Sequence, residues 1–228
     1  MHIMEGFLPL EWCLVWFAIS IPIVAWGAIK VIRTLREHPE QKMILAVSGA
    51  FVFVLSSLKL PSVTGSSSHP TGTGASTMLY GVAITSVLST IVLIFQAILL
   101  AHGGLTTLGA NIFSMGIAGP AVAYGVFKVM QKAKIGLVPT VAVTASLANL
   151  VTYVVTAIQL ALAYPTAGSV ITSLVTFLEV FAITQIPLAV AEGILMVMFF
   201  DYLSKTRPDL LEGKLFFKKK DTEVVAGA

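Results

Sequence analysis

Residues 78–101 read MLYGVAITSVLSTIVLIFQAILLA, a run of 24 residues without one charged side chain. A helix of about 20 apolar residues is long enough to cross the hydrocarbon core of a bilayer. Only 11% of the 228 residues are charged, whereas a soluble domain carries about 25%. We therefore predict an all-α polytopic membrane helix bundle and exclude soluble enzymes and nucleic-acid binders. Similar apolar blocks cover residues 8–29, 43–58, 112–127, 138–163 and 170–203.

The basic residues predict the orientation of the bundle. Lys and Arg are enriched in short cytoplasmic loops of membrane proteins. The stretch after the first block is therefore cytoplasmic, which leaves the N-terminus outside, and the basic tail is cytoplasmic as well. The residues concerned are Lys30, Arg33, Arg36 and Lys42 after the first block, and Lys205, Arg207, Lys214 and Lys218–Lys220 in the tail.

The number of spans depends on where a long block breaks. Residues 170–203 make a block of 34, too long for one ordinary span, and we expect Pro187 to divide it into two. This gives about seven transmembrane helices, but it leaves residues 128–134, with three lysines, outside, against the charge rule. Two alternatives remain. A re-entrant hairpin within Met78–Ala101 would return those lysines to the inside, whereas a six-span topology would place the basic tail outside.

The chain is predicted to form one integral membrane domain, residues 1–228. We divide it into an N-terminal segment with an extra helix and a cytoplasmic loop (1–42), a six-helix core (43–204) and a cytoplasmic tail (205–228). The core includes an external loop, 59–76, rich in Gly, Ser, Thr and Pro. Such residues let a backbone turn tightly over a site.

The first two residues form a chelator. No Lys or Arg precedes Lys30, so a cleaved signal peptide is not expected, and the bulky His2 should protect Met1 from removal. The Met1 amine, the His2 amide nitrogen and His2 Nδ1 would then close a five-membered and a six-membered ring around a metal. These donors are nearly coplanar, and a fourth nitrogen completes a square plane, the geometry typical of Cu(II) or Ni(II) and accessible to Co(II).

His69 is the predicted fourth donor, because it lies on the external loop. His102, at the end of a span, could be a ligand, a hydrogen-bond partner of a ligand or an interfacial residue, whereas His38 lies in the basic loop and should be solvated. Asn111 is predicted to bind a loop group or a ligating imidazole, since such ligands usually have a hydrogen-bond partner.

Two acidic residues, Glu179 and Glu192, lie inside the final apolar block, where a charge costs several kcal/mol, about 2.5 to 3.5 by insertion scales. They could serve as acceptors beside the metal ligands, as a proton path or as a route for the cation. A neutral carboxyl hydrogen-bonded to Thr184, Gln185 or a backbone carbonyl is the alternative.

Four stretches resemble the CbiM and NikM family, the substrate-binding membrane components of energy-coupling-factor transporters for cobalt and nickel. The similarity extends over nearly the whole chain. The stretches are MHIMEGFLP (1–9), LPSVTGSSSHPTGTG (60–74), AHGGLTTLGAN (101–111) and QIPLAVAEG (185–193).

The resemblance implies a subunit in a prokaryotic cell membrane that binds Co(II) or Ni(II) as its transported substrate through Met1, His2 and His69. It also implies three kinds of partner: a T-type transmembrane scaffold, two cytoplasmic ATPases and, in many members, a small accessory membrane subunit. Independently, the sequence lacks a phosphate-binding loop of the type Gly-x-x-x-x-Gly-Lys-Ser/Thr, so any ATP would be hydrolysed elsewhere.

Our leading hypothesis is therefore ATP-driven capture and uptake of Co(II) or Ni(II) by a non-enzymatic transporter subunit. The alternative is a proton-coupled carrier of a small solute that uses Glu179 and Glu192 as a relay. Ala46 and Ala50, four residues apart, would let another helix approach closely, either from the scaffold or from within the bundle.

Overall fold

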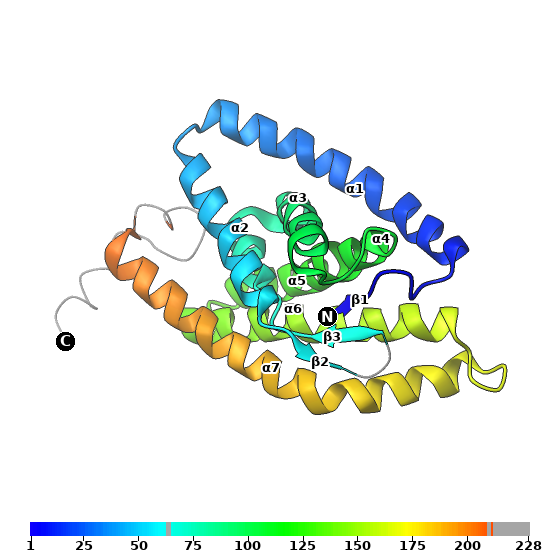
Figure 1. Cartoon of the computed structure of the whole chain (residues 1–228). Helices are drawn as coiled ribbons and strands as arrows, with labels where there is room; N and C mark the ends of the chain where they lie inside the picture. The colour runs from blue at the N-terminus through cyan, green and yellow to red at the C-terminus, as the bar shows by residue number, and fades with distance from the viewer. Residues whose placement is uncertain (63–64, 209–210, 212–228) are drawn as a thin grey trace.

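The computed structural model describes residues 1–62, 65–208 and 211 as a bundle of long helices around a small buried sheet (Figure 1). Five of its helical stretches are long and apolar enough to cross a membrane, and α2 is a shorter apolar helix. The predicted helical membrane bundle is confirmed. The helices are α1 (Leu10–Glu37), α2 (Gln41–Ser57), α3 (Thr73–Leu100), α4 (Leu108–Asn111), the π-helix η1 (Ile112–Ala118), α5 (Gly119–Lys132), α6 (Leu137–Ala163) and α7 (Val170–Thr206).

The expected break at Pro187 is wrong, because α7 runs as one helix from Val170 to Thr206 with Pro187 inside it. Proline frees one carbonyl of the helix, but in membrane helices neighbouring groups and small local adjustments satisfy it. At about 1.5 Å per residue the 37-residue helix is about 55 Å long, longer than the hydrocarbon core.

The break lies instead at Gly81, within the block for which a re-entrant hairpin was the alternative. Gly81 has φ 75° and ψ 178°, a conformation open essentially to glycine alone. Tyr80 donates a hydrogen bond to Gln41 at the start of α2, and Lys59, just after α2, donates to the Leu100 carbonyl. The part of α3 after Gly81 therefore runs alongside α2 in the same direction, and Thr73–Tyr80 runs the opposite way.

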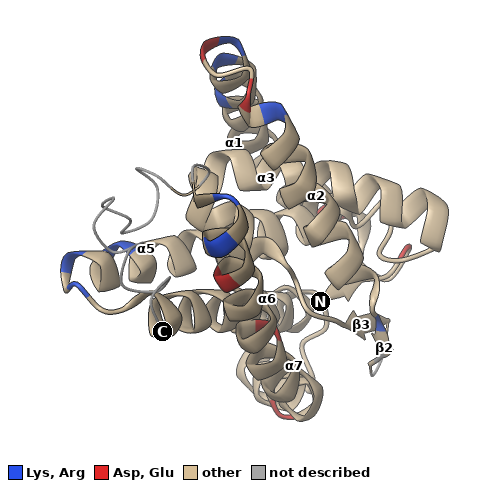
Figure 2. Cartoon of the chain, turned by 90° about the vertical axis from the view of Figure 1, so that its left-hand side faces the viewer, with Lys and Arg blue, Asp and Glu red and all other residues tan. Residues whose placement is uncertain are grey.

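This arrangement gathers the basic residues. The α1–α2 connection, the α5–α6 connection and the end of α7 all lie at one end of the bundle, and Figure 2 views that end with its Lys and Arg residues in blue. The expectation that Lys128, Lys132 and Lys134 lie opposite the other basic stretches is wrong. Most of the predicted tail, 205–228, lies outside the described residues.

The three-stranded sheet has the order β1-β3-β2 and is antiparallel throughout. β1 (His2–Ile3) pairs with β3 (Ser66–Ser68), with His2 opposite Ser67. β2 (Leu60–Pro61) pairs with the other edge of β3, with Leu60 opposite Ser68. Residues 66–79 are all buried, so the Gly- and Ser-rich loop enters the bundle and brings the chain's first residues with it.

Candidate metal centre

Three histidines from distant parts of the sequence meet beside β1. His2 and His69 are completely buried and His102 is 2% exposed. One potential ligand atom from each lies within 4.8 Å of the others. The pairing of β1 with β3 brings His2 next to the strand that leads into His69, while His102 follows the end of α3. The structure thus brings together both predicted histidine ligands and the residue predicted as a ligand or its neighbour.

The hydrogen bonds of His69 fix its tautomer. Its Nδ1 lies 2.8 Å from the Pro70 carbonyl oxygen, which can only accept, so Nδ1 carries the proton. The Nε2 atom of His69 is then unprotonated, and it contacts Nδ1 of His2 directly. A ligating imidazole is commonly oriented in this way by a carbonyl on its other nitrogen.

Gln96 is a buried polar neighbour of His2 that sequence reasoning missed. The Gln96 amide nitrogen donates to the Ser56 hydroxyl at 2.7 Å, which turns its carbonyl oxygen away from that contact. Within the described part of the chain neither this oxygen nor His2 Nε2 has a hydrogen-bond partner, and the Gln96 side chain acts on His2 by opposing the lowering of its pKa. A proton on Nε2 would leave the lone pair of His2 Nδ1 free for a metal. In the sequence, the feature that could have pointed to Gln96 is that it is a single amide side chain in an otherwise apolar block.

Burial keeps the nitrogen donors uncharged. Burial lowers the pKa of the Met1 amine to about 5, with Glu192 acting in the opposite direction. Burial lowers the pKa of His102 to about 3 and holds the pKa values of His2 and His69 well below their usual range. The charges that these groups would carry if protonated repel one another and add to the effect. At neutral pH the pocket therefore presents an amine and three imidazoles with free lone pairs.

The N-terminal segment is held by the stretch around α4. The Asn111 side chain accepts a hydrogen bond from the Ile3 amide at 2.8 Å and donates to the Ile3 carbonyl at 3.0 Å. It thereby substitutes for a neighbouring strand on the open edge of β1. Thr107 also donates to the Ile3 carbonyl, at 2.8 Å. Asn111 therefore binds the backbone next to a ligand, and not an imidazole.

Glu5 extends this attachment beyond the strand. Its carboxylate accepts hydrogen bonds from the amides of Leu105 and Thr106, and the Thr106 hydroxyl accepts one from the Gly6 amide at 3.2 Å. The bonds from Thr106 are the main reason that the pKa of Glu5 lies below its usual value. Gly103, at φ +77°, lies against the ring of His2, and a side chain there would meet the His2 ring carbon Cδ2 at 3.0 Å.

Glu192 holds the loop that carries His69. Its completely buried carboxylate accepts from the Thr71 amide at 2.6 Å, the Gly72 amide at 2.7 Å, the Thr71 hydroxyl at 2.8 Å and the Asn149 amide at 2.7 Å. Asn149 was not predicted. These contacts tie the two residues that follow His69-Pro70 to both α6 and α7.

Glu179 is not part of this cluster. It is exposed on α7, 13 residues before Glu192, which corresponds to about 20 Å along the helix. Two carboxylates at this separation do not form a direct proton relay. The carrier alternative thus lacks the pair of neighbouring acids that it requires.

Comparison with known proteins identifies the family of the chain. The family profile described as "Cobalt uptake substrate-specific transmembrane region", CbiM, matches residues 2–210. A cobalt transport protein CbiM from Carboxydothermus hydrogenoformans is 56% identical over 205 residues, covering 90% of this chain and 84% of that protein. Another from Desulforamulus reducens is 54% identical over 214 residues, covering 93% and 85%.

The fold also matches solved structures. A crystal structure described as a truncated transition metal transporter superposes with a TM-score of 0.79 at 26% sequence identity, covering 90% of this chain and 99% of that one. A second, described as a transition metal transporter, gives a TM-score of 0.78 at 25% identity. The profile match over almost the entire chain and the close bacterial relatives establish that this multi-pass membrane protein belongs to the CbiM family of cobalt-uptake transmembrane proteins.

Proposed function

We propose that the chain captures Co(II), and also accepts Ni(II), in a square plane of four nitrogens: the Met1 amine, the His2 amide nitrogen, His2 Nδ1 and His69 Nε2. The observation that carries this proposal is the direct contact of two buried ring nitrogens, His2 Nδ1 and the unprotonated Nε2 of His69. A cation bound by both nitrogens would replace this contact. In a plane of this kind the fourth donor is adjacent to the chelate's imidazole, as His69 is to His2.

The charge balance of the pocket supports a divalent cation. A dication bound to one ionised amide and three neutral donors leaves a net charge of +1, and burying an uncompensated charge is costly. Glu192 supplies a compensating negative charge, since it acts electrostatically on the Met1 amine and accepts four hydrogen bonds from donor groups. Glu192 thus favours the cation without needing to contact it.

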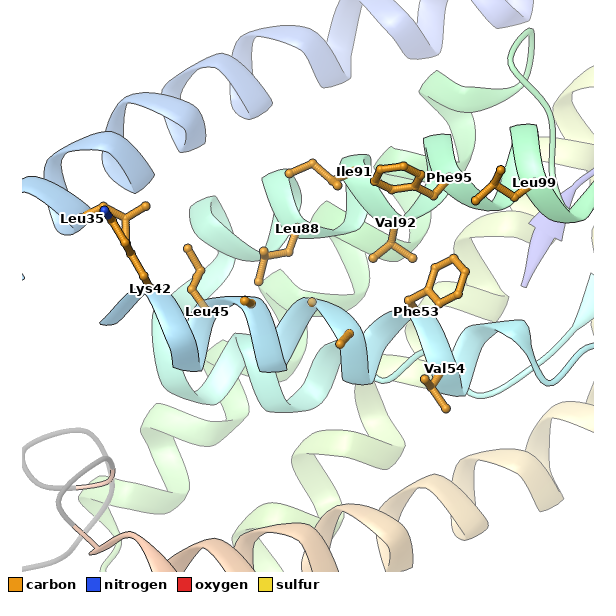
Figure 3. Close-up of a pocket in the computed structure, with 13 residues that line it drawn as sticks. Leu35, Lys42, Leu45, Phe53, Val54, Leu88, Ile91, Val92, Phe95 and Leu99 are labelled. Carbon is orange, nitrogen blue, oxygen red and sulfur yellow. The ribbon is translucent and has the colours of Figure 1, made fainter. Parts of the chain in front are cut away.

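We infer that uptake is driven by ATP in partner subunits of an energy-coupling-factor transporter: a T-type scaffold, two ATPases and a small accessory membrane subunit. A groove of about 590 Å³ between α2 and α3 suits the scaffold (Figure 3). The small residues Ala46, Gly49 and Ala50 form part of its α2 wall, and such residues let a partner helix approach closely. Lys42 lies at one end of the groove.

In this arrangement the basic end of the bundle faces the cytoplasm, because it carries the Lys and Arg residues that positive-inside topology requires. The metal then enters from outside, with residues 1–42 as the capture segment and 43–204 as the core. The tail, 205–228, lies on the side of the ATPases.

Adding two residues before Met1 tests the amine as a ligand. The extension moves the imidazole away from the amine and leaves no room for a buried terminus, since Met1 is 1% exposed. Affinity for Co(II), measured by calorimetry on purified protein, should fall by more than about 1,000-fold, to the level of unspecific binding. The matched control carries the same two residues at the C-terminus and should bind normally. Unchanged affinity in the N-terminally extended protein would refute the proposal.

A further inference from the structure

His102 is the third imidazole of the cluster. Its ring centroid lies 4.3 Å from that of His2, the same separation as between His2 and His69. The His102 ring is inclined by 40° to that of His2 and is nearly perpendicular to that of His69, at 84°. Because the Met1 amine, the two nitrogens of His2 and His69 Nε2 fill the four positions of the proposed plane, a donor from His102 would bind outside that plane.

One nitrogen of His102 is left with a free lone pair. Its Nε2 lies 2.8 Å from the Ser67 hydroxyl on β3. Its Nδ1 is buried and has no hydrogen-bond partner within the described part of the chain. Leaving a buried polar atom unpaired destabilises the folded protein. A ligand on Nδ1 removes that cost when Nε2 carries the proton and donates it to Ser67.

The backbone holds this ring in place. Ala101 and Gly103, on either side of His102, both have positive φ, 45° and 77°, and turn the chain sharply after α3. The Gly103 carbonyl accepts a hydrogen bond from the Glu5 amide at 3.2 Å, which ties the turn to the segment that carries the amine and His2. His102 is therefore fixed relative to the chelate.

Building on the proposed function, we propose that His102 Nδ1 is a fifth donor, bound to the metal along the axis perpendicular to the four-nitrogen plane. Two observations carry this assignment: His102 Nδ1 is buried without a partner among the described residues, and one ligand atom of each of the three imidazoles lies within 4.8 Å of the others.

An axial imidazole discriminates between the two metals. Low-spin planar Ni(II) has a filled orbital along that axis, which repels a fifth donor, whereas low-spin Co(II) has a single electron there and accepts one. The general order of affinities favours Ni(II) over Co(II) at a site of given ligands. His102 therefore raises the affinity for Co(II) relative to that for Ni(II), and offsets part of the general preference for Ni(II).

Electron paramagnetic resonance of the protein loaded with Co(II) tests the assignment. One axial nitrogen splits each low-spin cobalt line into three, and ¹⁵N-labelled histidine changes the three lines to two. The wild-type protein should give this splitting. If the wild-type protein bound no Co(II), the proposed function itself would be refuted. A low-spin planar signal without axial nitrogen splitting would overturn only the role of His102.

His102→Gln separates the two metals. The variant should lose the axial splitting and about 10-fold in Co(II) affinity, while Ni(II) affinity changes by less than about 2-fold. His38→Gln, at the basic end of the bundle, is the matched control and should change neither affinity. Equal losses for both metals, or splitting that persists in the variant, would overturn the assignment. If His102→Gln cannot be purified in folded form, the labelled wild-type spectrum still decides.

Discussion

The two segments that supply the proposed ligands are held in different ways. Met1–Gly6 ends in a free amine, and next to His2 it is attached through neutral hydrogen bonds, such as those between Asn111 and the Ile3 backbone, while its charged Glu5 contacts are exposed. Ser66–Gly72 continues into helices or strands at both ends and is attached through the buried carboxylate of Glu192. Hydrogen bonds to a charged group contribute about 1.5–3 kcal/mol each, against about 0.5–1.5 for neutral ones.

This difference divides the site into a fixed half and a docking half. The loop with His69 is part of the core of the bundle, whereas the segment with Met1 and His2 can leave without disturbing a helix. Changes in the fixed half should therefore reduce metal affinity more than changes in the attachments of the docking half.

The largest effect within the fixed half is expected for His69→Ala. The variant loses one of four proposed nitrogen donors, so Co(II) affinity should fall by at least about 100-fold, more than the 10- to 100-fold typical for loss of a ligand's hydrogen-bond partner. Calorimetry measures the effect, and His38→Ala, whose side chain is 62% exposed, is the control. A loss below about 10-fold would mean that another group replaces His69.

Glu192→Gln should come next, with a loss of about 10- to 100-fold in metal affinity. The amide removes the compensating charge and turns an NH₂ group toward donors that need an acceptor. Glu179→Gln on the same helix is the matched control, because Glu179 is exposed and far from the loop. Equal behaviour of the two variants would contradict the assignment of Glu192 to the fixed half.

Asn111→Ala should have a smaller effect, about 10-fold, since Thr107 and the pairing with β3 still hold Ile3. The loss should appear mainly as a faster dissociation of the N-terminal segment, measurable as faster hydrogen exchange of the first residues. A loss as large as that of His69→Ala would mean that the segment is as much part of the core as the loop.

The smallest expected effect concerns the number of protons that metal binding releases. Because burial lowers the pKa of the Met1 amine to about 5, a docked amine is already neutral at pH 7, whereas a free one, with a pKa of about 7.7–8.0, is mostly charged. Metal binding at pH 7 should then release about one proton, from the His2 amide. Affinity should fall more steeply as pH drops through about 5, where the docked amine takes up a proton. Calorimetry in two buffers of different ionisation enthalpy gives the count, and two or more protons at pH 7 would mean that the segment docks only with metal.

The sequence predicted the helical membrane bundle, because charge-free blocks are long enough to span a bilayer by themselves. The histidines that it indicated as ligands, His2 and His69, lie together in the structure, whereas their binding of a metal stays a prediction. The position of the break in the bundle could not be predicted in the same way. Pro187 is a stronger helix breaker than Gly81 in isolation, yet α7 continues through the exposed Pro187, and the reversal at Gly81 shows only in long-range contacts such as that of Tyr80 with α2.

The partners of the ligands were the least predictable part. Gln96 and Asn149 are single amides in apolar helices, and nothing in their neighbouring residues connects them with His2 or Glu192, from which they are separated by many residues. Likewise, the role of Asn111 depends on the open edge of β1, which exists only once the two-residue strand has paired with β3.

The uninterrupted course of α7 has a mechanical consequence. From Glu192 to Thr206 the helix contains no proline and spans about 20 Å, ending among the basic residues. A rigid rod of this kind transmits a push or tilt at one end directly to the other. A subunit that binds the basic end of α7 can therefore move Glu192, whose carboxylate holds the His69 loop. It can in this way weaken metal binding without contacting the metal.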